Sequence, residues 1–381
     1  MRILIVFGTR PEAVKLAPLI HDLRQRPGAD VEVCLTGQHR EMVTQVVSFF
    51  GVDVDHDLEI MRPNQTLSDV AARTLTGVDR ILESRRPDWV IVQGDTSTCL
   101  ATALAAFHRK VRVAHVEAGL RSGDPHAPFP EEMNRVLTTP IASLHLAPTS
   151  RAKANLRAER VPEDRIRVVG NTGIDALLLA VQTLRDRGLD ATYGARFPFL
   201  RPSRPLVLVT GHRRESFGQP FEELCEAIRD VATGDDVDVV YPVHLNPNVR
   251  EPVFRILSGL SNVHLVEPVE YPALVWLAQR SRFILTDSGG IQEEASALGK
   301  PVLVMRDVTE RQESVEAGVS RLVGTSREVI REACNSLLRD EATYARMARR
   351  VDLYGDGKAS ARIGDALGLP PSGASREWAA A

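Results

Sequence analysis

The chain repeats one local pattern along almost its whole length: a short apolar run, a turn that contains glycine, and a helical stretch. Ile3–Phe7, Val31–Leu35 and Trp89–Val92 are apolar runs of this kind, each followed by such a turn and a helix. Short apolar runs bounded by turn residues are typical of buried parallel strands. Strands that alternate with helices form right-handed βαβ units. The pattern therefore predicts an α/β fold with parallel sheets.

The pattern stops once and then restarts. The proline-rich segment Leu189–Pro205 has little periodicity, and the apolar run Leu206–Val209 begins the alternation again. A chain of 381 residues is long enough for two domains with proper cores. We expect two doubly wound halves with a ligand held between them.

Composition excludes several classes of protein. A net charge of −3 with scattered arginines gives no indication of nucleic-acid binding. Cys34, Cys99, Cys225 and Cys334 lie far apart, so neither a disulfide framework nor a metal site is predicted. The N-terminal apolar run is too short for a signal peptide, and no segment approaches the length of a membrane span. We expect a cytoplasmic protein.

The stretch from Phe283 to Arg311 contains an anion-binding signal. A strand, Phe283–Thr286, leads through Ser288, Gly289 and Gly290 into a helix. A helix start presents unpaired N–H groups, and glycines let a phosphate approach the backbone. Glu294 lies one turn deeper, within reach of ribose hydroxyls. The alternative is a serine-capped helix with acids in its first turns.

Polar side chains also follow the strands elsewhere. The residues at these strand ends are Arg10, Asp95, Glu117, His212 and Ser288. Ligands of open α/β sheets bind outside the carboxyl ends of the strands. Unrelated helix caps would give a similar scatter. The long irregular segment Gly119–Pro130 is of the kind that is functional or mobile.

Long motifs carry a family resemblance. They are FGTRPEAVKLAPL, QGDTSTCLATALAAF, HVEAGLRSGD, PEEMNR, GNTGIDAL, TGHRRESFG, PVHLNPNVREP and LTDSGGIQEEASALGKPVLVMRDVTER. With these motifs in one order, the chain from Met1 to Arg362 resembles the bacterial non-hydrolysing UDP-N-acetylglucosamine 2-epimerases. The resemblance implies a GT-B-like fold of two facing Rossmann-like domains with a cleft, a homodimer, and interconversion of UDP-GlcNAc and UDP-ManNAc without metal or nicotinamide.

The resemblance also implies a domain division and a set of site residues. Residues 1–170, joined by a C-terminal helix in 358–381, form the domain with the catalytic acids, and residues 171–357 form the UDP-binding domain. The residues around the diphosphate and in the nucleotide site are Arg10, Lys15, His212, Leu274, Ser288, Gly289, Gly290, Glu294 and Arg311. His212 also counts as catalytic, since cations and donors that face a departing diphosphate stabilise its developing charge.

The chemistry requires acids as well as this clamp. The C2 hydrogen of UDP-GlcNAc has no neighbouring carbonyl, and the first turn, GTRPEAV, is not a dinucleotide fingerprint. The remaining route eliminates UDP to give 2-acetamidoglucal and then re-adds it. The matching acids are Asp95, Glu117 and Glu131. Asp95 and Glu131 also fit structural roles at helix starts, whereas Glu117 ends an apolar strand, where an isolated carboxylate is costly. The sequence leaves open which acid removes the C2 proton and which returns it.

The chain departs from the family pattern in some places. Val269 and Leu274 stand where glutamine and an aromatic residue are expected near the uracil. The motifs that border a second, activating UDP-GlcNAc site in bacterial members include Gln38, His39, Arg40 and His244. Glu41 stands where an amide is common, which puts that regulation in doubt.

Other functions fit parts of the same sequence. A GT-B glycosyltransferase shares the nucleotide site but needs an acceptor, and a hydrolysing relative releases ManNAc and UDP. A related epimerase acts on a different UDP-2-acetamido sugar. A sugar-nucleotide sensor would keep the clamp without the three acids.

Overall fold

The computed structural model of the chain describes residues 1–37, 40–62 and 64–372. The chain forms two compact units: unit 1 comprises Met1–Leu179 and the C-terminal segment from Tyr354, and unit 2 comprises Ala180–Leu353. The sequence prediction set the division after residues 170 and 357. The division in the structure falls within helix α7 (Thr172–Asp186), which runs from unit 1 into unit 2.

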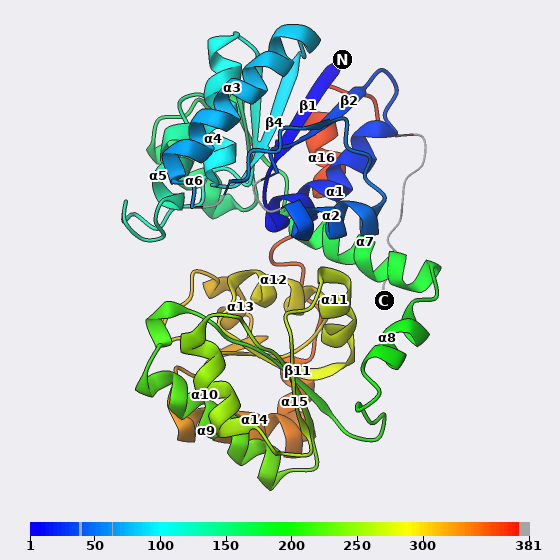
Figure 1. Cartoon of the computed structure of the whole chain (residues 1–381), viewed down its shortest axis with the longest axis vertical. Coiled ribbons are helices and arrows are strands. Elements are labelled where there is room, and N and C mark those ends of the chain that lie inside the picture. The colour runs from blue at the N-terminus through cyan, green and yellow to red at the C-terminus, as the bar shows by residue number, and fades with distance from the viewer. Residues whose placement is uncertain (38–39, 63, 373–381) are drawn as a thin grey trace. The chain divides into compact units, whose positions relative to one another are not determined.

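Unit 1 is a seven-stranded parallel sheet with helices on both faces (Figure 1). Its strands are β1 (Arg2–Phe7), β2 (Asp30–Leu35), β3 (His56–Asp57), β4 (Trp89–Gln93), β5 (Arg112–Val116), β6 (Leu144–Ala147) and β7 (Ile166–Val168). Its helices are α1 (Arg10–Arg24), α2 (Arg40–Phe50), α3 (Leu67–Arg85), α4 (Ser97–His108), α5 (Glu131–Thr138), α6 (Ser150–Ala158), the first part of α7, and α16 (Ala359–Ala366), with a 3-10 turn η1 (Glu163–Arg165).

Unit 2 repeats the architecture with a six-stranded parallel sheet. Its strands are β8 (Leu206–Thr210), β9 (Asp238–Pro242), β10 (Val263–Val266), β11 (Ser281–Thr286), β12 (Val302–Val304) and β13 (Ser320–Leu322). Its helices are α8 (Asp190–Arg196), α9 (Gln219–Gly234), α10 (Pro247–Leu257), α11 (Tyr271–Arg280), α12 (Gly289–Ala297), α13 (Gln312–Glu316), α14 (Arg327–Arg339) and α15 (Glu341–Met347), with a 3-10 turn η2 (Arg214–Ser216).

The strand order of each sheet reverses direction once. In unit 1 the order is β3-β2-β1-β4-β5-β6-β7, and in unit 2 it is β10-β9-β8-β11-β12-β13. The helices after β1 and β4 therefore leave toward opposite faces, as do the connections after β8 and β11. Such a reversal opens a crevice at the carboxyl ends of the two central strands, where ligands of these folds bind. Arg10 and Asp95 follow β1 and β4, whereas His212 and Ser288 follow β8 and β11.

The strands form because their apolar residues are buried on both faces. All five residues of β4 are buried, and α3 and α4 pack on one face through Val78, Leu82 and Ala103. In unit 2, Phe221, Tyr241 and Phe283 are fully buried in one core cluster. Fully buried aromatic rings of this kind contribute much of the apolar area removed from water. The thiols of Cys34 and Cys99 are free and buried.

Helix α16 packs against α1 although the two are far apart in sequence (Figure 1). The buried Arg26 guanidinium donates to the Ala361 carbonyl oxygen at 2.6 Å and to Asp365 Oδ1 at 2.7 Å. At the start of α16, Asp175 accepts the N–H of Ser360 at 2.7 Å. Buried charged groups are stable only when they are paired in this way. The C-terminal segment up to residue 372 is thus part of unit 1, and the rest of the predicted segment 358–381 lies outside the described residues.

Several elements differ from the prediction. The short strands β3, β6 and β13 were not predicted, and the segment Leu189–Pro205, predicted as an irregular junction, contains α8. Helix α8 packs in unit 2, where Trp276 Nε1 donates to Asp190 Oδ1 at 3.0 Å.

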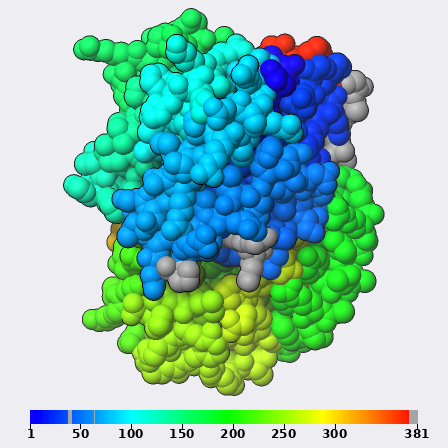
Figure 2. All heavy atoms as spheres, turned by 45° about the horizontal axis from the view of Figure 1, so that its top comes forward, coloured from blue at the N-terminus to red at the C-terminus, as the bar shows by residue number. Residues whose placement is uncertain are grey.

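None of the described helices has the length and apolar character needed to cross a membrane. On the face seen in Figure 2, the blue and cyan segments, which include α3, form a continuous exposed surface.

Candidate active site

The turn after β1 is organised by a buried glutamate. Glu12 is 1% exposed, and its Oε2 accepts the Gly8 N–H at 3.0 Å, the Thr9 N–H at 2.8 Å and the Thr9 hydroxyl at 2.8 Å. Burial raises the pKa of Glu12, although these hydrogen bonds oppose the increase. Glu12 was not predicted as a site residue. The Thr9-x-x-Glu12 spacing of a capping box was the sequence signal for its role.

Arg10 is the first residue of α1. Its side chain is partly buried and forms no hydrogen bond or ion pair with any residue that the structure describes. A cation at the carboxyl end of a central strand, without a protein partner among the described residues, is available to a ligand anion.

Glu117 adopts an unusual backbone conformation directly after β5. Its φ of +65° lies in the left-handed region, which costs about 1 kcal/mol or more for a residue with a Cβ. Its side chain is 12% exposed, and Oε2 accepts Lys15 Nζ and Gln93 Nε2, each at 2.5 Å. Strain of this kind is concentrated at functional sites. Gln93, the last residue of β4, was not predicted as a site residue.

Asp95 lies in the same cluster. Its Oδ2 accepts a hydrogen bond from Nε of Arg135 at 2.8 Å, and Nη2 of Arg135 lies 2.7 Å from the same oxygen as an ion pair. Burial raises the pKa of Asp95 above its ordinary value; the Arg135 cation opposes this increase, and the neighbouring Glu117 carboxylate adds to it. Lys15 also acts on Asp95 electrostatically. The structure therefore brings together Lys15, Asp95 and Glu117 at the carboxyl ends of β4 and β5.

The third predicted acid, Glu131, begins α5. It is partly buried and forms no hydrogen bond or ion pair within the described part of the chain. Its neighbour Glu132 is the buried one, and it accepts Arg135 Nη1 at 3.1 Å. Helix α5 also carries Asn134, which holds the main chain of Asp95. The segment before α5 is exposed from Ser122 to Phe129.

In unit 2, the predicted anion site has the expected local structure. Strand β11 ends at Thr286, Ser288 is the N-cap residue, and α12 begins at Gly289. A Cβ at Gly289 would lie 2.7 Å from Cζ of Arg311, so only glycine leaves room for this guanidinium. Arg311 pairs with Glu293 at 2.9 Å. The structure thus places a cation against the helix start, and both are suited to a phosphate.

His212 is positioned by Asp287, which was not predicted as a site residue. Asp287 is 2% exposed, and its Oδ2 accepts the N–H of His212 at 2.7 Å and of Arg213 at 2.8 Å. Its Oδ1 lies 3.8 Å from His212 Nδ1. The exposed His212 ring also stacks on His244 with 5.1 Å between ring centroids. The prediction assigned these two histidines to different sites, and the structure brings them into contact.

The residues predicted near the nucleoside lie on α11 and α12. Tyr271 donates its hydroxyl to Glu294 Oε1 at 3.2 Å, and burial together with this carboxylate raises the pKa of Tyr271 well above its ordinary value. Leu274 lies on the same helix and is partly buried, and Val269 is buried just before it. Gln38 and His39 lie outside the described residues, and Arg40 begins α2.

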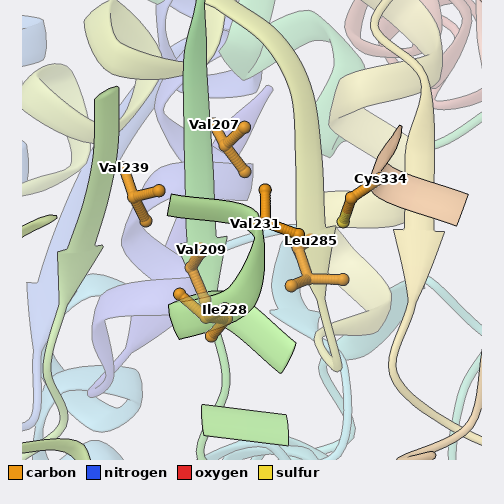
Figure 3. A pocket seen from close by; sticks show the side chains of 7 residues that line it. All are labelled: Val207, Val209, Ile228, Val231, Val239, Leu285 and Cys334. Carbon is orange, nitrogen blue, oxygen red and sulfur yellow. The ribbon is translucent and has the colours of Figure 1, made fainter. Parts of the chain in front are cut away.

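A small void in unit 2 is lined by none of the predicted site residues. It has a volume of about 10 Å³ and is lined by Val207, Val209, Ile228, Val231, Val239, Leu285 and Cys334 (Figure 3). An apolar cavity of this size holds at most one water molecule. It is a packing defect of the core, and it is no ligand site.

Two units of parallel strands flanked by helices, each with polar residues at the switch point of its sheet, define a GT-B-like α/β protein, as predicted. A spinosyn rhamnosyltransferase shares this fold, with a TM-score of 0.59 at 17% identity over 96% of this chain and 100% of that chain.

Residues 21–368 match the family model described as UDP-N-acetylglucosamine 2-epimerase. The chain belongs to this family. It is 53% identical over 369 residues to the UDP-N-acetylglucosamine 2-epimerase of Escherichia coli K12, covering 96% of this chain and 98% of that one. The enzyme of Salmonella typhimurium is 52% identical over 370 residues, with the same coverage. The Neisseria meningitidis UDP-GlcNAc 2-epimerase, solved bound to UDP-GlcNAc, has a TM-score of 0.90 at 44% identity over 96% of this chain and 99% of that chain.

Proposed function

We propose that the chain interconverts UDP-GlcNAc and UDP-ManNAc by elimination and re-addition of UDP. The observation that carries this proposal is the cluster of Asp95, Glu117 and Lys15 at adjacent strand ends in a member of this family. Two carboxylates whose environments differ are what proton removal and proton return on one carbon require. The complex of the Neisseria meningitidis relative with UDP-GlcNAc supports the choice of substrate.

The proposed reaction breaks two bonds. The C1–O bond breaks with its electron pair leaving on UDP, and a carboxylate accepts the C2 proton. The C1–C2 double bond of 2-acetamidoglucal forms as these bonds break. Return of a proton to the opposite face of C2 and of UDP to C1 then completes the inversion. Asp95, Glu117 and Glu131 are the proposed acids, and which of them removes the proton is left to experiment.

The diphosphate clamp is proposed to stabilise the departing UDP. In unit 2 it consists of His212, Ser288, Gly289, Gly290 and Arg311, and unit 1 contributes Arg10 and Lys15. Glu294 and Leu274 are proposed to contact the nucleoside. Fixed donors and cations that face a developing negative charge are usually the largest catalytic contribution. Residues 1–170 with 358–381 would then form the catalytic domain, and residues 171–357 the UDP-binding domain.

We infer a cytoplasmic homodimer that binds neither nucleic acid nor membrane and needs no cofactor. Gln38, His39, Arg40 and His244 are proposed to border a second UDP-GlcNAc site. The stack of His244 on His212 supports communication between that site and the clamp, because the two rings are in direct contact.

Incubation with UDP-GlcNAc alone, followed by NMR of the sugar products, tests the function. The proposal predicts an equilibrium mixture of UDP-GlcNAc and UDP-ManNAc. Free ManNAc with UDP would identify a hydrolysing enzyme. No reaction, with retained UDP binding, would favour a glycosyltransferase that lacks its acceptor, an epimerase for another UDP-2-acetamido sugar, or a sensor.

A further inference from the structure

Helix α5 holds Asp95 at two points. Asn134 Nδ2 donates to the main-chain carbonyl oxygen of Asp95 at 2.8 Å, and the Arg135 guanidinium donates through Nε to Asp95 Oδ2 and forms an ion pair with it. Both contacts come from one helical turn, so the backbone and the carboxyl group of Asp95 are fixed together. Neither Asn134 nor Arg135 was singled out from the sequence.

Arg135 contacts only one oxygen of Asp95. Oδ2 accepts a hydrogen bond from Nε at 2.8 Å and lies 2.7 Å from Nη2 in an ion pair, and no described residue donates a hydrogen bond to Oδ1. A carboxylate held through one oxygen keeps the other for a substrate proton. The side chain is therefore oriented without being blocked.

The remaining amino group of Arg135 is fixed by Glu132. Arg135 Nη1 donates to Glu132 Oε2 at 3.1 Å, and Glu132 Oε1 accepts the N–H of Gly123 at 3.1 Å. Glu132 is 2% exposed, so its charge acts on Arg135 with little screening by water. Arg135 thus lies between two carboxylates. The buried Glu132 fixes the position of Arg135, and Arg135 in turn orients Asp95.

We propose that Arg135 is the positioning residue for Asp95, and that Glu132 sets how strongly the Arg135 charge acts on it. This inference rests on the proposed function, in which Asp95 exchanges a proton with C2. Neither residue is proposed to touch the substrate. Glu132 also accepts the N–H of Gly123, so we infer that the position of the segment around Gly123 and the charge of Asp95 are linked.

Removal of the Arg135 charge or of the Glu132 charge should shift the pKa of Asp95 in a definite direction. The charged groups that act on Asp95 are Arg135 from α5, Lys15 from α1 and Glu117 from the end of β5. Loss of the Arg135 cation must raise the pKa of Asp95, because the ionised form loses its partner. Loss of the Glu132 charge must lower it, because Arg135 is then neutralised less. The two substitutions therefore shift one titration in opposite directions.

The test compares Arg135→Gln with Glu132→Gln in the pH dependence of kcat for UDP-GlcNAc epimerisation. The limb that Asp95 controls should move to higher pH in Arg135→Gln, by about one unit or more, and to lower pH in Glu132→Gln. This holds whether Asp95 acts as acid or base. Arg135→Lys keeps the charge but loses the Nε donor, so it should lower kcat while leaving the limb near its wild-type position. Arg109→Gln, which breaks an exposed pair with Asp79, is the matched control and should change neither.

The proposal would be overturned if both variants lost activity while the Asp95-controlled limb of each pH profile stayed at its wild-type position. It would also be overturned if this limb moved in the same direction in both variants. A wild-type protein inactive on UDP-GlcNAc would instead overturn the proposed function. In that case the pH dependence of the thermal midpoint still tests the pairing. Arg135→Gln should lose stability relative to the wild type as pH rises from 4 to 8, because a carboxyl group with a raised folded pKa loses its stabilising contribution in that direction. A difference in thermal midpoint between Arg135→Gln and wild type that stays constant with pH would contradict the pairing of Arg135 with Asp95.

Discussion

Thr96 donates its hydroxyl to Glu12 Oε1 at 2.6 Å, and this hydrogen bond joins the two turns at the switch point of the unit 1 sheet. The other oxygen of Glu12 holds the Gly8–Thr9 turn that leads to Arg10. Thr96 follows Asp95 and caps α4 by accepting the N–H of Cys99 at 3.0 Å. One buried carboxylate therefore sets the spacing between a proposed clamp residue and a proposed acid.

Glu12→Ala should destabilise the protein by about 2 kcal/mol or more, because it leaves buried N–H groups of Gly8 and Thr9 without an acceptor. Urea unfolding measures the change. The control is Glu83→Ala, which removes an exposed carboxylate paired with Arg109 and should cost at most about 1 kcal/mol. Equal losses in the two variants would show that Glu12 has no special structural role.

Arg10→Ala and Glu117→Gln should separate binding from turnover. Loss of one charged hydrogen bond to phosphate costs roughly 1.5–3 kcal/mol, so Arg10→Ala should weaken UDP binding about ten- to over a hundred-fold. Glu117→Gln should leave UDP affinity nearly intact and abolish turnover. Calorimetric titration with UDP and a turnover assay measure both. Equal weakening of UDP binding would place Glu117 in the nucleotide site and contradict this division of roles.

Gly289→Ala should weaken UDP binding without unfolding the protein. The new Cβ would lie 2.7 Å from Arg311 Cζ, so the guanidinium must leave its position beside the helix start. Gly194→Ala in α8 is the matched control, because a Cβ there meets no atom within 4 Å. We expect reduced UDP affinity in the first variant alone, with thermal midpoints close to wild type in both. Unchanged affinity in Gly289→Ala would exclude Arg311 from the clamp.

Asp175 should make unit 1 less stable as pH rises. Burial raises its pKa to about 6, against the hydrogen bonds from Ser360 and Ala359. An aspartate in the unfolded chain ionises near pH 4, so the folded state binds the extra proton between about pH 4 and 6. Below about pH 4, Asp175 makes its full contribution to the free energy of unfolding. Above about pH 6 this contribution, roughly 2–3 kcal/mol, is lost. The thermal midpoint of wild type relative to Asp175→Asn should therefore fall from pH 4 to pH 7, and a constant difference would contradict the raised pKa.

The fold was largely predictable because each βαβ unit is encoded locally. Apolar runs, glycine turns and helical stretches lie next to one another in the sequence, so the strands named from it, such as Ile3–Phe7 and Leu206–Val209, are present with nearly the same bounds. The elements that were missed have weak local signals. Strand β6 (Leu144–Ala147) is short and contains the buried His145, and α8 lies in a segment whose prolines suggested a loop.

The site was predictable only in part, for a different physical reason. Residues that follow strands can be found by position, as Asp95, Glu117 and His212 were. The residues that hold them act across long sequence separations: Arg135 is 40 residues from Asp95, and Asp287 is 75 residues from His212. No local pattern reports such a pairing, because it is created by the order of strands in the sheet.

The most direct test of the account is turnover of UDP-GlcNAc in D₂O, with NMR of the UDP-ManNAc that forms. If UDP departs and C2 is re-protonated on the opposite face by a second acid, the product must carry solvent deuterium at C2. Full retention of protium at C2, while UDP-ManNAc accumulates, would contradict the elimination mechanism.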